Sequence, residues 1–95
     1  MALYVLIGHD GKQGLERRKR WREDHLRGLE PLAAARRIRH AGPLLDPAGQ
    51  PVGSLILFEA PSLDDARSLA AADPYVMHGV FERYEVRETK VVFPR

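Results

Sequence analysis

Apolar and polar residues follow one another in blocks that predict four strands and three helical segments. Residues 3–7 form a short, nearly continuous apolar run that ends at Gly8, which is typical of a strand covered on both faces. His, Asp and Gly at residues 9–11 predict a turn or loop. Residues 15–36 repeat apolar side chains at helical spacing among Arg, Lys and Glu, which predicts a long amphipathic helix. We expect Pro31 to kink or break this helix, because an interior proline removes a backbone hydrogen-bond donor.

The middle of the chain predicts a hairpin. Residues 36–45 contain a second strand, which runs into a Gly-Pro bend. Residues 46–53 are loop-forming throughout, and residues 54–60 are again nearly continuously apolar. Because two strand-like segments flank a short loop, we expect them to pair.

The last third of the chain predicts two helical segments and a final strand. Ser62 and Asp65 resemble a capping box in front of a helix over residues 63–72. Asp73 then precedes a proline, an arrangement that suits the start of a short helical turn over residues 74–79. The remaining segment alternates polar and apolar residues and predicts a fourth strand, interrupted near residue 89.

The order of these elements is βαββαβ, the ferredoxin-like pattern of the α+β class. Two helices then cover one face of a four-stranded antiparallel sheet, and the other face has no partner within the chain. The strands are nevertheless apolar on both faces, and an uncovered apolar sheet face rarely stays in water. We therefore expect a homodimer in which two sheets pack face to face across a two-fold axis.

Composition narrows the class of protein. The 95 residues suit one domain over 1–95, and the absence of cysteine excludes disulfides, thiolate catalysis and cysteine-ligated metal. The short apolar run at the N-terminus is no signal peptide and no membrane span, so we expect a cytoplasmic protein. The histidines match no metal motif, and no phosphate loop or dinucleotide fingerprint is present. We therefore expect neither a metal nor a cofactor.

The charge distribution is uneven although the net charge is only +2. Residues 16–40 carry a net charge of +5 and the remaining residues a net charge of −3, so we expect a basic pole near the first helix. Such a pole attracts an anionic small molecule, an acidic partner or nucleic acid. Residues 17–22 are strongly basic but match no helix-turn-helix spacing and no aromatic RNA-binding signature, so nucleic acid is not the expected partner.

A candidate site lies along one face of the first helix, where Arg18, Arg22, His25 and Leu29 recur at spacings of four, three and four. One interpretation is an anion clamp beside an imidazole that titrates near neutrality. The other is a solvated basic face with a histidine at its border. The pattern alone leaves both interpretations open.

Asp73 also has two interpretations, which are compatible. Its carboxylate caps the helical turn that follows, and its second oxygen is free to accept a hydrogen bond from an imidazole. Ser54 either faces a pocket or simply ends the hairpin. Tyr75 and Trp21 are more typical of packing residues than of a catalytic acid or a stacking platform.

Three segments together resemble the YciI-like family over nearly the whole chain. RWREDHLRGL at residues 20–29 resembles the family's Arg-x-x-His-Leu helix, and IRHAGPL at residues 38–44 resembles its strand ending in Ala-Gly-Pro. Residues 53–86 resemble its Gly-Ser strand, second helix and Ala-Asp-Pro-Tyr segment. The resemblance implies a dimeric α+β barrel whose site pairs His25 with Asp73.

The resemblance also implies a pocket bordered by Arg22 and Ser54, and Arg18, Tyr75 and His78 complete the candidate substrate-binding set. His78 departs from the family, in which this position is more often small, so we expect it to narrow the pocket. At least one branch of the family is associated with elimination of chloride from a chlorinated hydroxyaromatic compound.

Three functions remain open. The first is a cofactor-independent lyase or isomerase in which His25 transfers a proton, Asp73 orients it and the arginines hold an anionic or enolic oxygen. The second is a non-catalytic module or accessory subunit that binds a small anion. The third is a purely structural dimer with a buried, hydrogen-bonded histidine.

Overall fold

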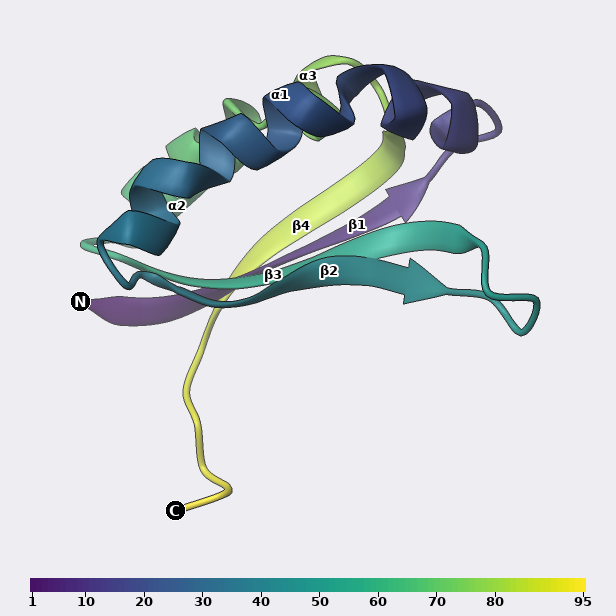
Figure 1. The fold of residues 1–95 in the computed structure, drawn as a ribbon. Coiled ribbons are helices and arrows are strands. Elements are labelled where there is room, and N and C mark those ends of the chain that lie inside the picture. Colours follow the sequence, from purple (N-terminus) through teal and green to yellow (C-terminus); the bar gives the residue numbers. More distant parts are fainter.

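The computed structural model describes residues 1–95 and has the predicted order of elements (Figure 1). A short helix stands between the second long helix and the last strand, where the sequence predicts a helical turn. The elements are β1 (Ala2–Asp10), α1 (Gly14–Ala34), β2 (Ile38–Leu45), β3 (Pro51–Ala60), α2 (Leu63–Ala71), α3 (Pro74–Met77) and β4 (Phe81–Thr89).

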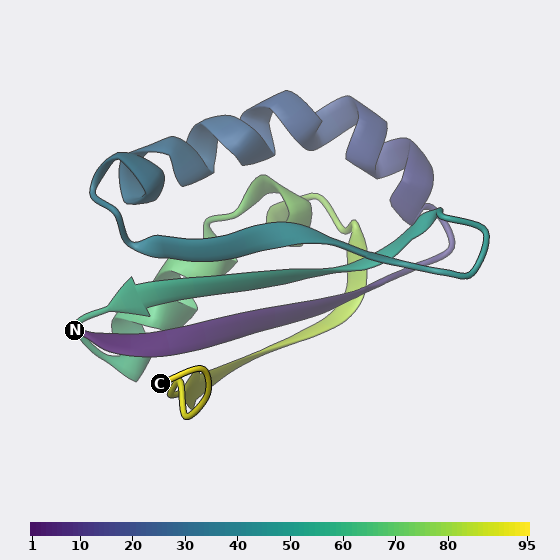
Figure 2. The same ribbon diagram turned by 60° about the horizontal axis from the view of Figure 1, so that its bottom comes forward.

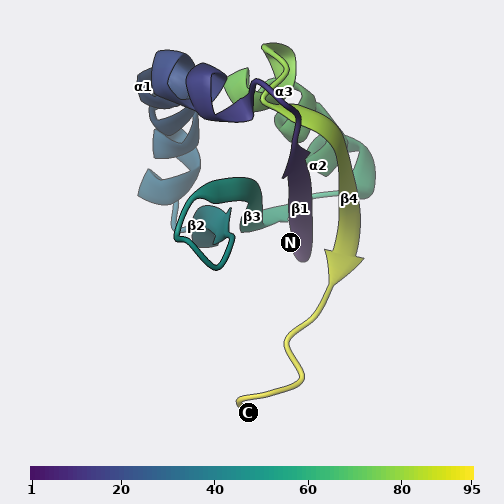
Figure 3. The same cartoon turned by 90° about the vertical axis from the view of Figure 1, so that its right-hand side faces the viewer.

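The four strands form one antiparallel sheet in the order β2-β3-β1-β4. All three helices lie on the same face of this sheet, and Figure 3 shows the C-terminal residues leaving toward the opposite side. Figure 2 shows α1 running along the sheet over most of its length. This is the ferredoxin-like α+β fold that the sequence predicts. None of the helices combines the length and apolarity needed to cross a bilayer.

The core fills the space between the sheet and α2. Tyr4 and Leu6 of β1 lie opposite Phe58 and Ile56 of β3, and all four are buried. Alternate residues of each strand therefore face the helices, as a pleated strand requires. Two buried alanines of α2 complete this cluster, and their small side chains allow close approach of helix and sheet.

The opposite face of the sheet is apolar at its centre. Val5 lies beside Leu57, and Ile7 lies beside Leu55, in the paired strands β1 and β3. These side chains are only half-buried, and no helix of the chain covers them. The continuous apolarity that the sequence shows in both strands thus reflects one covered face and one open face.

Two local predictions were wrong. Residues 9–11 are not all loop, because β1 continues through His9 and Asp10 before the chain turns. The helix α1 also continues past Pro31 and ends at Ala34. Pro31 lies in the last turns of α1, so it removes only one helical hydrogen bond, which a backbone N–H at residue 31 would donate to the carbonyl of the exposed residue Arg27.

The end of α1 explains why the helix stops before residue 36. Arg37 donates its backbone N–H to the Leu32 carbonyl at 2.8 Å, and Arg36 donates to the Ala33 carbonyl at 3.0 Å. Arg36 has a φ of 59°, in the left-handed region. This is the Schellman arrangement, in which a left-handed residue closes the helix.

Candidate active site

His25 and Asp73 form a buried pair between α1 and α3. The Nδ1 atom of His25 lies 2.7 Å from Oδ1 of Asp73, and the two residues are only 8% and 9% exposed. The same Oδ1 accepts the backbone N–H of Tyr75 at 2.8 Å. Asp73 therefore caps α3 and holds the imidazole at once, although one oxygen serves both roles where the sequence suggested two.

This geometry determines which ring nitrogen of His25 carries the proton. A carboxylate accepts a hydrogen bond, so Nδ1 of His25 carries the proton and Nε2 of the neutral ring carries the lone pair. Nε2 forms no hydrogen bond within the chain, and no buried polar side-chain atom is left without a partner. Nε2 is therefore accessible from outside the protein, as a general base must be.

Tyr75 holds the imidazole from one side. Its ring stacks on that of His25 at 3.9 Å between centroids, and the edge of the Phe81 ring meets it at 6.2 Å. Gly8 makes room for this arrangement, because a Cβ there would lie 2.7 Å from the Phe81 ring. Burial raises the pKa of Tyr75, an effect that the nearby Arg18 and Arg22 oppose, so the phenol keeps its proton at neutral pH.

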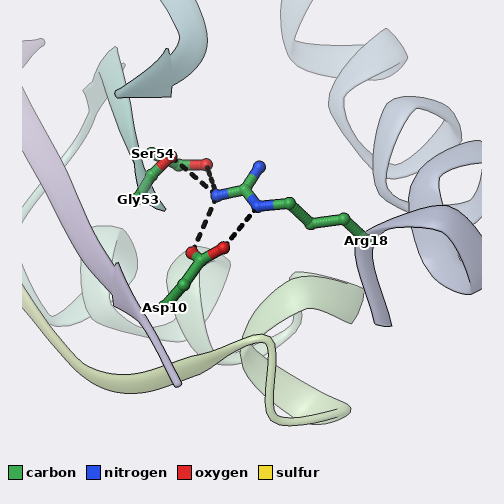
Figure 4. A network of polar contacts seen from close by, with 4 residues as sticks. All are labelled: Asp10, Arg18, Gly53 and Ser54. Atoms are coloured by element: carbon green, nitrogen blue, oxygen red, sulfur yellow. Dashed lines mark hydrogen bonds and ion pairs between the residues drawn. The ribbon is translucent and has the colours of Figure 1, made fainter. Parts of the chain in front are cut away.

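Arg18 lies two turns before His25 on α1 and forms a second buried pair, with Asp10 (Figure 4). Its Nε and Nη2 atoms donate to the two Asp10 oxygens at 2.7 and 2.9 Å. Nη2 also donates to the Gly53 carbonyl at 2.6 Å and to the Ser54 hydroxyl at 3.0 Å. Four hydrogen bonds therefore hold the guanidinium in place, and only its Nη1 atom has no hydrogen bond within the chain.

A cavity of about 290 Å³ opens between α1 and the β2–β3 hairpin. Three cationic side chains line it, Arg18, Lys19 and Arg22, and no Asp or Glu does. Because Asp10 neutralises Arg18, the field in the cavity is set mainly by Lys19 and Arg22. The other lining residues are Leu15, His25, Ala41, Gly42, Pro43, Pro51, Ser54, Ile56 and Tyr75.

The structure brings most of the predicted site residues together. Arg18, Arg22, His25, Ser54 and Tyr75 all line the cavity. Asp73 does not line it and instead contacts His25 on the ring edge where Nδ1 lies.

His78 is the exception among the predicted site residues. Its ring stacks on that of Trp21 at 3.4 Å, and it does not line the cavity. It therefore cannot narrow the pocket as the sequence suggested. The physical reason is its position as the C-cap of the short helix α3, where its ring lies against that of Trp21 in α1.

Sequence reasoning missed two residues of the site. Asp10 was assigned to a loop, and Lys19 was counted only within a basic cluster. The three-residue spacing of Lys19 from Arg22 was available as a signal, because side chains three residues apart share a helix face. The partner of Arg18 was not, because Asp10 approaches it across the sheet–helix junction. The described residues include no group of three or more His, Asp or Glu side chains arranged to hold a metal ion.

Comparison with known families and sequences gives consistent matches. The YCII-related domain model matches residues 2–90. Protein YciI of Escherichia coli O6:H1 is 39% identical over 97 residues, which covers 96% of this chain and 99% of that protein. A protein of Haemophilus influenzae is 35% identical over 96 residues, which covers 95% of this chain and 98% of that protein.

Solved structures give two informative matches. The 5-chloro-2-hydroxyhydroquinone dehydrochlorinase TftG of Burkholderia phenoliruptrix, in complex with 2,5-dihydroxybenzoquinone, superposes with a TM-score of 0.81. It is 30% identical, with 93% of each chain covered. A NIPSNAP family protein of Agrobacterium tumefaciens superposes with a TM-score of 0.56 at 18% identity, covering 96% of this chain and 93% of that one. The second match reflects a shared fold alone.

Proposed function

The chain belongs to the YCII-related domain family, and we propose that it is a cofactor-independent enzyme that moves a proton on a small anionic hydroxyaromatic or enolic substrate. One observation carries the proposal. His25 has one ring nitrogen held by a buried carboxylate and the other accessible, and its ring lines a cavity with cationic walls. This is the arrangement that a general base needs.

The proposed reaction begins with the substrate anion between Arg22 and Lys19. Nε2 of His25 takes a proton from the substrate, and the negative charge of Asp73 stabilises the imidazolium that forms. The electron pair released from the broken bond moves into the conjugated ring of the substrate. It then expels an anionic leaving group, or it takes the proton back at another position.

Tyr75 has a supporting role in this scheme. Its hydroxyl forms no hydrogen bond within the chain and stays protonated at neutral pH. A protonated phenol can donate a hydrogen bond to a substrate oxygen on which charge develops. Arg18, locked by Asp10, serves as a rigid wall and offers only Nη1.

The likeness to TftG supports this substrate class. That protein acts on a chlorinated hydroxyhydroquinone, and its bound ligand is a dihydroxyquinone. Removal of hydrogen chloride from such a ring releases one proton and one chloride, which is the chemistry of a base facing an anionic ring. The proposal for this protein therefore includes a hydroxyaromatic ring and a proton transfer, and it does not specify the leaving group.

Exchange of substrate hydrogen with solvent deuterium tests the proposal. Hydroxyquinones are incubated with the protein in D₂O, and chloride release from 5-chloro-2-hydroxyhydroquinone is measured in parallel. His25→Gln should lower either rate by about 10²- to 10⁴-fold, the usual contribution of a general base. His40→Gln is the matched control, because His40 is an exposed histidine that does not line the cavity. Equal rates for His25→Gln and wild type would overturn the proposal.

The cavity also supports a second candidate, a module that binds a small anion without changing it. Lys19 and Arg22 need no base to hold an anion, and they make up most of its charge. In that case 2,5-dihydroxybenzoquinone binds to wild type and to His25→Gln with similar affinity, and neither protein catalyses deuterium exchange. Loss of binding in Arg22→Gln with no exchange in wild type would favour this module over the enzyme.

We further propose that the protein is a homodimer whose two sheets pack through their open faces. Val5, Ile7, Leu55 and Leu57 form an apolar strip that the chain itself leaves uncovered. Burying such a strip against its own copy satisfies both subunits through one self-complementary surface. Leu57→Glu should convert the dimer to monomer in analytical ultracentrifugation, whereas Glu30→Gln, at an exposed position of α1 on the other side of the sheet, should not. A monomeric wild type would refute this arrangement.

A further inference from the structure

A second pocket is lined by both members of the His25–Asp73 pair, whereas His25 alone of the two lines the cationic cavity. It has a volume of about 160 Å³ and lies between α1 and the segment that joins α2 to α3. We call it the rear pocket. Its lining is His25, Gly28, Leu29, Leu32, Leu69, Ala72, Asp73 and Pro74. His25 is the one residue that it shares with the cationic cavity.

Asp73 lines the rear pocket, and one of its carboxylate oxygens has no hydrogen bond within the chain. Oδ1 accepts both hydrogen bonds of this carboxylate, from His25 and from the Tyr75 backbone, and Oδ2 accepts none. Asp73 is only 9% exposed, yet no buried polar side-chain atom lacks a partner, so Oδ2 is accessible. Asp73 does not line the cationic cavity, and the other pocket that it lines has a volume of only about 20 Å³, so the rear pocket is the space from which a ligand can reach Oδ2.

Gly28 lines the rear pocket without a side chain that could fill it. Glycine inside a helix is less favourable than alanine, because the flexible backbone loses more freedom on folding. Packing does not require glycine here, since a Cβ at residue 28 would meet only Cδ of Pro74, at 3.8 Å. A longer side chain at this position would extend into the rear pocket.

The walls of the rear pocket select the kind of molecule that fits it. Leucine, alanine and proline side chains supply an apolar surface, and a single acceptor oxygen stands among them. A water molecule needs several polar partners to be held in a protein, whereas an apolar cavity of roughly 150 Å³ holds a six-membered ring. A carboxylate oxygen in such surroundings favours a ligand with an apolar body and one hydrogen-bond donor.

We propose that the rear pocket is a second binding site, which takes a small neutral alcohol whose hydroxyl donates to Oδ2 of Asp73. Such a hydrogen bond draws negative charge from the carboxylate that holds His25. The rear pocket and the cationic cavity are therefore linked through the pair between them, and binding at one changes binding at the other. The site itself does not depend on the function proposed for the cationic cavity.

NMR titration with cyclohexanol tests this site on the intact protein without any other ligand. The methyl signals of Leu29, Leu32 and Leu69 should shift in a saturable way, with a dissociation constant on the order of 1 mM for so small a molecule. Cyclohexyl methyl ether has the same ring but no donor, and it should bind about tenfold more weakly. Shifts at Ala41 and Ser54 in place of the leucines would put the alcohol in the cationic cavity and overturn the proposal.

A pair of substitutions at one position provides the structural control. Gly28→Leu should abolish the saturable shifts, because the new side chain fills the rear pocket, and Gly28→Ala should preserve them. Both residues favour helix more than glycine does, so both variants should fold. Binding of 2,5-dihydroxybenzoquinone, measured separately, reports on the cationic cavity and distinguishes failure of that site from failure of this one. Undiminished cyclohexanol binding by Gly28→Leu would overturn the assignment.

Discussion

The helix α1 contributes to two buried acid–base pairs, and they differ in how completely their atoms are used. Arg18 and Asp10 are joined by two hydrogen bonds, and the same guanidinium nitrogen that reaches Asp10 also donates to Gly53 and Ser54. His25 and Asp73 share a single hydrogen bond of 2.7 Å, which leaves Nε2 and Oδ2 without partners in the chain. The first pair joins α1 to the end of the preceding strand β1, and the second joins α1 to a residue 48 positions away in the sequence.

The difference separates a structural pair from a chemical one. Arginine does not lose its proton in proteins, so the Arg18 pair has fixed charges and a fixed geometry. Imidazole can take up and release a proton, and the His25 pair has accessible atoms for that exchange. The first pair positions α1 against the hairpin, and the second places a titratable group two turns further along the same helix face.

Removing one partner of the Arg18–Asp10 pair should give the largest loss in the free energy of unfolding. Asp10→Ala leaves a buried guanidinium without its counter-charge, and such a loss typically costs about 3–5 kcal/mol in the free energy of unfolding. That is a large part of the stability of a small domain, which is typically about 5–15 kcal/mol. Urea denaturation of the purified variant measures the loss.

A double variant sharpens the same test. Asp10→Leu combined with Arg18→Met removes both charges together and should recover most of the stability, because an apolar pair of similar size can replace a buried ion pair. If Asp10→Ala lowers the free energy of unfolding by less than about 1 kcal/mol, the pair does not stabilise the fold as its geometry indicates.

Both members of the His25–Asp73 pair could be predicted from the sequence. Of the Arg18–Asp10 pair, only Arg18 could. The stripe of Arg18, Arg22 and His25 follows from helical spacing, and Asp73 follows from its place before a proline. Family resemblance then joined His25 to Asp73. No periodicity could join Asp10 to Arg18, because their contact depends on β1 extending past Gly8.

The fold was predictable for a related reason. Hydrophobic periodicity and turn residues give the order of elements and the open sheet face, since both depend on local pattern. The details that failed depend on tertiary surroundings. Pro31 is tolerated because it lies near the end of α1, and His78 is removed from the site because its ring meets Trp21.

The second prediction separates the two roles of Asp73. Asp73→Ala removes both the cap of α3 and the partner of His25, so it should cost about 1–2 kcal/mol in the free energy of unfolding. Asp73→Asn keeps a capping oxygen and should cost much less, while it loses the charge that stabilises an imidazolium. Urea denaturation and deuterium exchange into a hydroxyquinone measure the two effects.

The stability and activity of Asp73→Asn decide between the two roles of Asp73. The proposed pair requires that Asp73→Asn stays nearly as stable as wild type and loses exchange activity. If Asp73→Asn retains full activity, Asp73 is only a helix cap, and the His25 pair belongs with the Arg18 pair as a structural device.

The smallest expected effect concerns Tyr75, whose ring lies between the two pairs and contacts both, at 3.9 Å from the His25 ring centroid and 5.2 Å from the Arg18 guanidinium carbon. Because its hydroxyl has no hydrogen bond within the chain, Tyr75→Phe should change the free energy of unfolding at pH 7 by less than about 1 kcal/mol.

At high pH the same substitution should become visible. Burial raises the pKa of Tyr75 above 10.0, so near that pH the unfolded chain releases a proton that the folded protein still holds. The unfolded state then binds fewer protons, and the free energy of unfolding falls as the pH rises through 10. Tyr75→Phe should therefore lose less stability than wild type between neutral and alkaline pH.

Tyr4, whose pKa burial also raises, remains in both proteins. Tyr84→Phe removes an exposed hydroxyl, and it should follow the wild-type curve. If Tyr75→Phe and wild type lose stability in parallel, the Tyr75 phenol is as solvated in the folded protein as in the unfolded chain, and burial does not raise its pKa.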